Sequence, residues 1–232
     1  MKHKYGYTTG SCAAGAAKGA ALGILKGTIP EFVTINTPIN TTLRLRLIHS
    51  KVGLNYAECS IRKYSGDDPD VTNGCEVHVR VKRSENACPN DSFPPKRSQI
   101  TRQAGIRFIG GEGVGIVTRP GLQVKQGEPA INPVPRAMIK DAIKEVLGDY
   151  DGISVTITVP EGKKLAKKTF NERLGIIGGI SIIGTTGIVR PMSLDLFKVS
   201  LLCGLDVAKA SGYETIVLVP GSVGEKGFLR RF

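Results

Sequence analysis

The sequence contains no tryptophan, and aromatic residues make up only 6% of its 232 residues. Proteins that hold single-stranded nucleic acid stack its bases on aromatic rings, so this scarcity argues against a binder of that class. The sequence also lacks any recognised DNA- or RNA-binding module. We therefore expect no nucleic-acid partner.

Patterns typical of metal sites are missing as well. The three histidines, His3, His49 and His78, lie far apart without ligand spacing, and the five cysteines form no Cys-x-x-Cys pair. An odd, scattered set of cysteines is typical of reduced thiols in a cytoplasmic protein rather than of disulfides or a zinc site. We interpret His49 and His78 as residues on strand faces and predict no metal ligands.

The apolar segment from Cys12 to Leu25 is the one candidate for a signal or membrane segment that we considered. Lys18 interrupts it, and it is too short to span a bilayer, so the sequence argues against both export and membrane insertion. A chain of 232 residues with 22% charged residues predicts a soluble protein with a substantial core, in one large domain or two small ones.

Charge is strongly unbalanced. Lysine and arginine number 32 against 20 acidic residues, which gives a net charge of +12 and indicates an anionic partner. A helix predicted over 161–168 concentrates four of these cations on one side. They form either a solvated surface or a surface that attracts a polyanion: Lys163, Lys164, Lys167 and Lys168.

A glycine- and isoleucine-rich stretch from Thr169 to Ser193 is the most distinctive part of the sequence. Glycine allows a ligand to approach bare backbone, and neighbouring hydroxyl and N–H groups suit a carboxylate, phosphate or ribose. A buried pair of strands with tight turns explains the pattern about as well. The candidate binding residues here are Gly178, Gly179, Gly184, Thr185, Thr186 and Gly187.

A loop and helix are predicted over Tyr5 to Gly27, with three glycines on one helix face for close packing. We interpret Cys12 as a small buried residue in preference to a reactive thiolate. The start of this helix is either simply capped or an anion site, because its N–H groups point outward. The candidates are Thr8, Thr9, Gly10 and Ser11.

Period-two alternation predicts half-buried antiparallel strands over 43–47, 56–63 and 75–81. The intervening loop, 65–74, contains Asp67, Asp68 and Asp70, whose mutual repulsion raises at least one proton affinity unless a cation or donor intervenes. These carboxylates are either turn residues or candidates for a general base or a cation site.

Further along, Gly110 to Gly115 predicts a β-hairpin or bulge, because strand rather than helix follows the glycines. Helices are predicted over 136–147 and 193–210, and a strand over 153–159. The continuous apolar run 215–219 predicts either the first strand of a parallel α/β sheet or a strand that joins the earlier sheet.

Five phrases together resemble one family: Tyr7 to Ala14, Gly66 to Thr72, Thr101 and Arg102 with Gly110 to Pro120, Gly127 to Arg136, and Val159 to Ser193. The sequence is similar to cobalt-precorrin-5B C1-methyltransferases of anaerobic cobalamin biosynthesis. The resemblance implies an α+β first domain with mixed and antiparallel sheets, 1–192, followed by the start of a Rossmann-like α/β domain, 193–232, that is truncated.

The resemblance also implies transfer of a methyl group from S-adenosylmethionine to ring carbon C1 of a tetrapyrrole. Cobalt then belongs to the substrate, whose acetate and propionate arms suit a basic protein. By chemical type, we assign the aspartates as candidate bases and the glycine–threonine turns as binding groups. A non-catalytic tetrapyrrole or polyanion carrier is the alternative, and the sequence leaves a homo-oligomer open.

Overall fold

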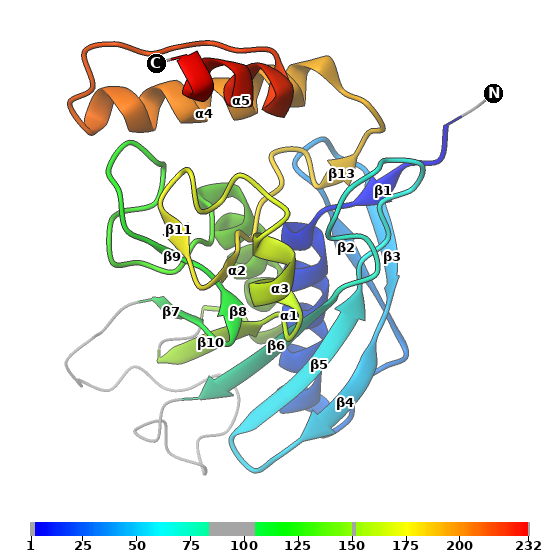
Figure 1. Cartoon of the computed structure of the whole chain (residues 1–232). Helices are drawn as coiled ribbons and strands as arrows, with labels where there is room; N and C mark the ends of the chain where they lie inside the picture. The colour runs from blue at the N-terminus through cyan, green and yellow to red at the C-terminus, as the bar shows by residue number, and fades with distance from the viewer. Residues whose placement is uncertain (1–2, 84–104, 150–151, 232) are drawn as a thin grey trace.

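The computed structural model describes residues 3–83, 105–149 and 152–231 (Figure 1). Its centre is a five-stranded sheet in the order β4-β5-β6-β10-β7, in which β10 and β7 are parallel and the other neighbours antiparallel. The bounds are β4 Ile48–Val52, β5 Tyr56–Arg62, β6 Glu76–Arg83, β7 Ile106–Gly110 and β10 Ile153–Thr158.

One face of this sheet forms the core. Helices α1 (Thr9–Lys26) and α2 (Pro133–Leu147) pack against each other, and α1 covers β5 and β6. The predicted alternation is confirmed, because alternate residues of the strands point into this core. The buried set is Ala57, Cys59, Ile61, Val77, Val79, Val81, Ile153, Val155 and Ile157.

The sequence signals for α1 are confirmed. The Thr8 hydroxyl accepts the Ser11 N–H as an N-cap, and Gly27 ends the helix in the left-handed conformation with φ 74°. A Cβ at Gly19 would lie 2.4 Å from the Leu47 side chain, so a larger residue there would force this side chain to shift. Cys12 is fully buried, as expected for a packing residue.

Helix α2 begins at Pro133, three residues earlier than predicted, because proline fits the first turn of a helix, where its missing N–H is not needed. The antiparallel pair β2 (Phe32–Asn36) and β3 (Thr42–Arg46) lies outside the five-stranded sheet.

Four two-residue strands join the two glycine-rich parts of the chain. Strand β8 (Gly113–Val114) pairs with β12 (Gly179–Ile180) in parallel, and β9 (Ile116–Val117) pairs with β11 (Ile176–Ile177) in antiparallel orientation. The predicted hairpin or bulge at 110–115 is therefore wrong. A Cβ at Gly179 would lie 2.2 Å from the Gly113 carbonyl oxygen, so the glycines allow this long-range pairing.

The basic helix is shorter than predicted: α3 covers only Gly162–Ala166 and packs on β8 and β12. Lys167 and Lys168 follow it in a turn, and all four lysines of the 163–168 segment are exposed. Only Lys163 and Lys164 lie in the helix, and adjacent residues do not share a helix face, so the predicted alignment of the four lysines does not form.

At the C-terminal end, α4 (Leu194–Ala210) and α5 (Gly221–Arg231) lie together on one side of the molecule (Figure 1). The predicted strand over 215–219 does not form. No neighbouring strand pairs with it within the described residues, and Leu218 is 79% exposed. None of the described helices is long and apolar enough to cross a bilayer. The architecture is α+β.

Candidate functional site

The start of α1 and the Gly184–Gly187 turn meet directly, although they are distant in sequence. Strand β1 (Gly6–Tyr7), just before α1, pairs with β13 (Ile188–Val189), just after the turn, and this pairing places the turn next to the start of the helix. The Ser11 hydroxyl donates to the Gly187 carbonyl at 2.7 Å, and the Thr8 N–H donates to the same oxygen at 3.2 Å. We call Thr8–Ser11, the acidic loop 65–74 and the Gly184–Gly187 turn the α1 corner.

Several polar groups of the corner are used within the chain. The Gly10 N–H donates to the Ile183 carbonyl at 2.9 Å, and the Thr9 hydroxyl contacts the same residue. Thr9 and Ser11 are 3% and 0% exposed. These groups therefore hold the turn against the helix, and a ligand at this corner must use other donors.

The turn itself provides such donors. Within the described residues, the backbone N–H groups of 184–187 have no hydrogen-bond partner, and Thr185 is exposed. Gly184 has φ 146° and Gly187 has φ 77°, and a Cβ at Gly184 would lie 2.2 Å from the Thr8 hydroxyl. Both glycines are therefore required by conformation, and Gly184 also by its close approach to the helix start.

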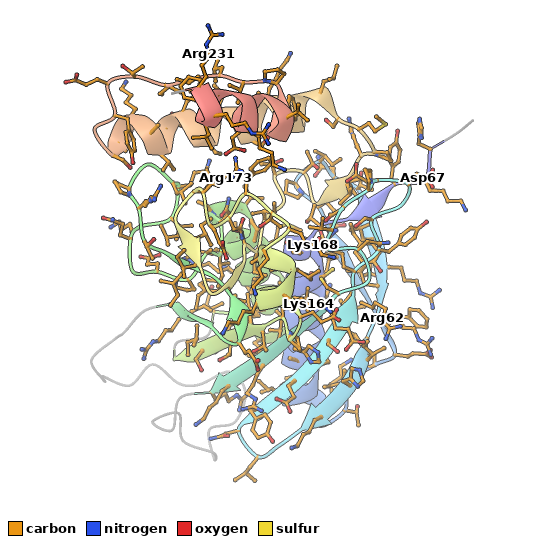
Figure 2. All side chains as sticks on the ribbon, in the orientation of Figure 1. Arg62, Asp67, Lys164, Lys168, Arg173 and Arg231 are labelled. Atoms are coloured by element: carbon orange, nitrogen blue, oxygen red, sulfur yellow. The ribbon has the colours of Figure 1, made fainter. Side chains whose placement is uncertain are left out.

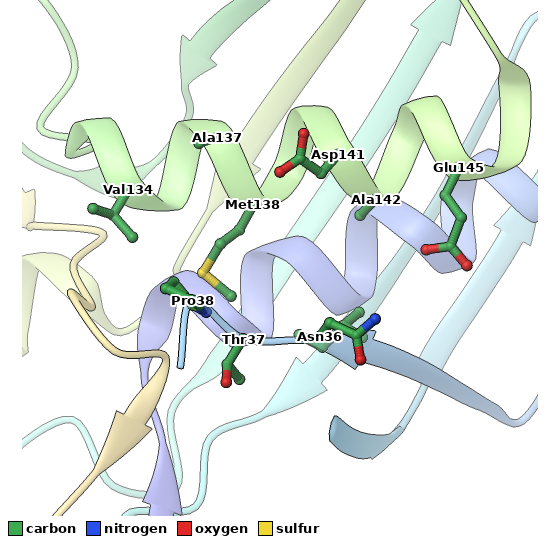
Figure 3. A pocket seen from close by; sticks show the side chains of 10 residues that line it. Asn36, Thr37, Pro38, Val134, Ala137, Met138, Asp141, Ala142 and Glu145 are labelled. Atoms are coloured by element: carbon green, nitrogen blue, oxygen red, sulfur yellow. The ribbon is translucent and has the colours of Figure 1, made fainter. Parts of the chain in front are cut away.

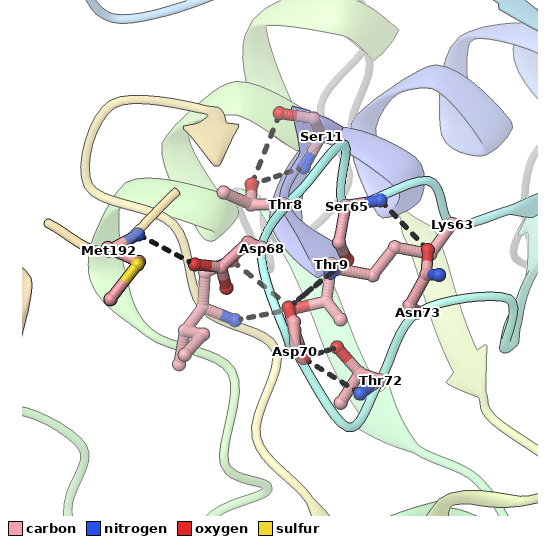
Figure 4. A network of polar contacts seen from close by, with 11 residues as sticks. Thr8, Thr9, Ser11, Lys63, Ser65, Asp68, Asp70, Thr72, Asn73 and Met192 are labelled. Atoms are coloured by element: carbon pink, nitrogen blue, oxygen red, sulfur yellow. Dashed lines mark hydrogen bonds and ion pairs between the residues drawn. The ribbon is translucent and has the colours of Figure 1, made fainter. Parts of the chain in front are cut away.

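In the acidic loop, Asp70 forms an ion pair with the buried Lys63 (Figure 4). The other Asp70 oxygen accepts from the N–H and hydroxyl of Thr72 at 2.7 and 2.6 Å. Lys63 also donates to the Ser65 hydroxyl at 2.6 Å. Burial alone would raise the pKa of Asp70, but the Lys63 charge and these hydrogen bonds outweigh it and hold the pKa below its usual value.

The other two carboxylates are more accessible. Asp67 is exposed and accepts the Lys4 N–H at 2.8 Å. Asp68 is half-buried and accepts the Met192 N–H at 3.1 Å, which ties the loop to the segment after β13 (Figure 4). Each of the three carboxylates therefore accepts a hydrogen bond from a nearby donor, which meets the condition expected from the sequence for offsetting their mutual repulsion. Asp70 is held as an anion by Lys63, whereas Asp67 and Asp68 have no lysine or arginine side chain as a partner among the described residues.

Sequence reasoning missed Lys63, although a signal was present. Its position continues the inward series Ala57, Cys59 and Ile61, so alternation places an ammonium group in the core. Lys63 is 3% exposed. A lysine at an inward strand position requires a buried anion, and the acidic loop that follows supplies it.

The remaining predicted residues lie elsewhere. Gly178 is exposed at the β11–β12 turn, and Gly179 pairs with β8. Lys163 and Lys167 belong to or follow α3, which packs on β8 and β12. The structure therefore divides the predicted residues into two groups, one at the α1 corner and one around β8, β12 and α3.

A cavity of about 450 Å³ lies between α2 and the β2–β3 turn (Figure 3). Its charged lining residues are Asp141 and Glu145, and Lys18 donates to Glu145 at 2.6 Å. None of the predicted site residues lines it. An acidic lining disfavours a polyanion, so this cavity does not match the expected substrate.

Comparison with known proteins identifies the family. Residues 1–191 match the model of the family described as CbiD. The chain belongs to the CbiD family. It is similar to proteins named cobalt-precorrin-5B C(1)-methyltransferase, with 48% identity over 226 residues in Moorella thermoacetica and 41% over 228 residues in Methanococcus maripaludis.

A solved CbiD structure supports the fold. The crystal structure of a cobalamin biosynthesis protein (cbiD) from Archaeoglobus fulgidus matches with a TM-score of 0.57 and 31% identity, covering 87% of this chain and 59% of that one. The Moorella and Methanococcus alignments each cover 97% of this chain but only 57% and 59% of the relatives. The chain therefore corresponds to somewhat more than half of a CbiD-family protein.

Proposed function

We propose that this chain is the substrate-holding part of a cobalt-precorrin-5B C1-methyltransferase. The reaction methylates ring carbon C1 with S-adenosylmethionine and gives cobalt-precorrin-6A in anaerobic cobalamin biosynthesis. The supporting observation is the 41–50% identity to proteins with that methyltransferase name over 96% or more of this chain. Buried, free thiols at Cys12, Cys59 and Cys75 fit a cytoplasmic location.

The charge of the chain supports a polycarboxylate substrate. Its net charge is +12, and the lysines of 163–168 are exposed beside the glycine strands. The cations attract the acetate and propionate arms of a tetrapyrrole and raise its local concentration. Cobalt enters as part of this substrate.

The α1 corner suits the carboxylate end of the methyl donor. We assign the N–H groups of Gly184–Gly187 and the Thr185 hydroxyl to that end, since these groups have no partner within the described residues. When bound, the donor supplies an electrophilic methyl group on a sulfonium, and the protein has to align it with the ring carbon and exclude water.

A base is needed for any proton that the ring system releases. Asp68 is our choice among the aspartates, because it is half-buried at the α1 corner and its hydrogen bond to Met192 orients it. Asp67 is the second candidate. Asp70 holds Lys63 instead, and its lowered pKa makes it a poor proton acceptor.

We further propose that residues 1–192 form the α+β domain and that 193–232 begin a Rossmann-like domain. The apolar run at 215–219 has the composition of a buried strand, yet Val217 and Leu218 are 49% and 79% exposed. Leu201 and Leu202 on α4 are 52% and 56% exposed as well. Such an apolar surface fits contact with the additional chain that the relatives possess.

The test is methyl transfer to cobalt-precorrin-5B, read by mass spectrometry. The chain is mixed with the part of the Moorella relative that extends beyond the aligned region, with S-adenosylmethionine as donor. Appearance of a product heavier by one methyl group supports the proposal. Corrinoid binding without any methylated product indicates a carrier, and absence of both binding and product contradicts the proposal.

A further inference from the structure

The face of the five-stranded sheet opposite α1 and α2 carries a row of polar side chains on neighbouring strands. Ser60 on β5 pairs in register with His78 on β6, and His78 with Thr158 on β10. The next row joins Glu58 to Arg80. This outer face therefore presents imidazole, guanidinium and hydroxyl groups together.

A cavity of about 380 Å³ lies on this face. It is separate from the α1 corner and from the acidic cavity beside α2, because it shares no lining residue with either. Its lining residues are His49, Glu58, Cys59, His78, Val79, Arg80, Thr156, Thr158 and Pro160.

An irregularity in β4 places one of the histidines. His49 has φ 52°, in the left-handed region that non-glycine residues rarely adopt, and the β4–β5 register shifts between Ile48 and Lys51. This bulge brings the His49 ring onto His78, with centroids 5.8 Å apart and an interplanar angle of 14°. Bulges of this kind often re-aim a side chain at a functional site.

A single carboxylate holds both rings. Glu76 Oε2 lies 3.2 Å from His49 Nε2 and 3.4 Å from His78 Nε2. The other Glu76 oxygen accepts from Arg62 at 2.7 Å. Strain in the backbone and a shared counter-ion therefore fix two imidazoles at the edge of one cavity.

We propose that the cavity between His49, His78 and Arg80 is a carboxylate-binding site that holds an acidic arm of the tetrapyrrole. The assignment to the tetrapyrrole rests on the proposed function, whereas the carboxylate chemistry follows from the cavity itself. Arginine and protonated histidine are strong donors to carboxylates, and the Thr156 and Thr158 hydroxyls can add further hydrogen bonds.

Charge balance makes the site sensitive to pH. Arg80 is paired with Glu58 and Arg62 with Glu76, so these side chains leave the cavity close to neutral, and protonation of His78 adds a positive charge. Burial lowers the pKa of His78, an effect that Glu76 opposes, and the net pKa lies below the usual histidine value. The charged or titratable groups that act on His78 are Glu76, His49 and Glu58, and Arg80 lines the same cavity.

The position of the cavity suits a substrate with several acidic arms. Pro160 lines it, and the chain continues from there into α3 with its exposed lysines. Figure 2 shows Lys164 on this helix and Lys168 just after its end. At the other end of the face, Arg62 is followed by two residues and then by the acidic loop of the α1 corner.

The experiment is calorimetric titration with uroporphyrin, a metal-free tetrapyrrole with acetate and propionate arms on every ring. The wild-type chain is compared with a His49→Gln/His78→Gln double variant at pH 6 and pH 8. Arg80→Gln is a second variant, His3→Gln controls for loss of an exposed imidazole, and Lys140→Gln controls for loss of an exposed cation. Thermal melts confirm that each variant is folded.

We expect the wild type to bind more tightly at pH 6 than at pH 8, and the double variant to bind about tenfold more weakly at pH 6, since hydrogen bonds to charged groups are the strong ones. The controls should leave binding unchanged. Equal pH dependence in wild type and double variant, or absence of uroporphyrin binding, overturns the inference.

The two proposals can fail separately. Histidine-dependent binding of uroporphyrin without methylation of cobalt-precorrin-5B supports this site and contradicts the proposed reaction. Methylation by wild type and double variant at equal rates, with an unchanged KM for the corrinoid, supports the reaction and contradicts this site.

Discussion

The buried ion pair between Lys63 and Asp70 gives the sharpest test of the corner. In Asp70→Asn, the Lys63 ammonium, whose side chain is 2% exposed, loses its anion and keeps only neutral oxygens as partners. Removing one partner of a buried pair costs about 3–5 kcal/mol, because an uncompensated charge remains in the core. That is a large part of the roughly 5–15 kcal/mol that stabilises a typical domain.

Urea unfolding measures this loss. With a slope of about 1–3 kcal/mol per molar urea, we expect the midpoint to fall by about 1 M or more. Lys63→Met/Asp70→Asn should recover much of the loss, since an apolar side chain of similar length fills the same space. Asp67→Asn removes an exposed carboxylate of the same loop and should change stability by less than about 0.5 kcal/mol.

The pH dependence has a definite sign. The pKa of Asp70 is lower in the folded chain than in the unfolded one, so its contribution is complete above the unfolded value of about 3.9 and is lost as pH falls through the folded pKa. The free energy of unfolding of Asp70→Asn should therefore change less with pH in the acid range than that of the wild type. An Asp70→Asn loss below about 1 kcal/mol, or a double variant no more stable than Asp70→Asn, would refute the reasoning.

Three further outcomes are expected. Gly187→Ala should lower the free energy of unfolding by about 1–3 kcal/mol, because φ is 77° and a Cβ there would lie 2.9 Å from the Thr37 side chain. Gly178→Ala, at φ 85° with no atom near the added Cβ, should lower the free energy of unfolding by less, and thermal melts of both variants measure the difference. Asp68→Asn should retain stability but slow methyl transfer about 100-fold or more when the chain is mixed with the remaining part of the Moorella relative. An unchanged rate would exclude Asp68 as the base. A thiol reagent at pH 8 should leave Cys59 and Cys75 unmodified until urea unfolds the chain, since burial raises their pKa values to about 12 and about 11. Modification of either in the native chain, mapped by mass spectrometry, would contradict the structure.

The elements with a regular pattern could be predicted from the sequence. Alternation located the strands that became β3, β5 and β6, and capping residues located α1 to within one or two residues. These signals are local, because the buried face and the helix ends are determined by neighbours within a few positions. The contact of the α1 start with the Gly184–Gly187 turn is not local, and it was not predicted from the sequence.

The errors have physical causes. Strands β8, β9, β11 and β12 have two residues each, which is too short for any periodicity, and their partners lie more than fifty residues away. The run 215–219 has strand composition, but a strand needs a hydrogen-bonded neighbour, and none is available to it within the described residues. The composition of a segment indicates whether it can be buried, but it does not identify the strand with which the segment pairs.

Strand β5 and its continuation connect the two proposed sites through the alternation of their side chains. Lys63 points inward and holds the acidic loop through Asp70, whereas Arg62 points outward and holds Glu76 between the two histidines. Successive side chains of a strand point to opposite faces, so a one-residue shift would exchange these roles. The register of β5 with β6, which pairs Arg62 with Glu76, therefore positions the α1 corner and the histidine cavity together.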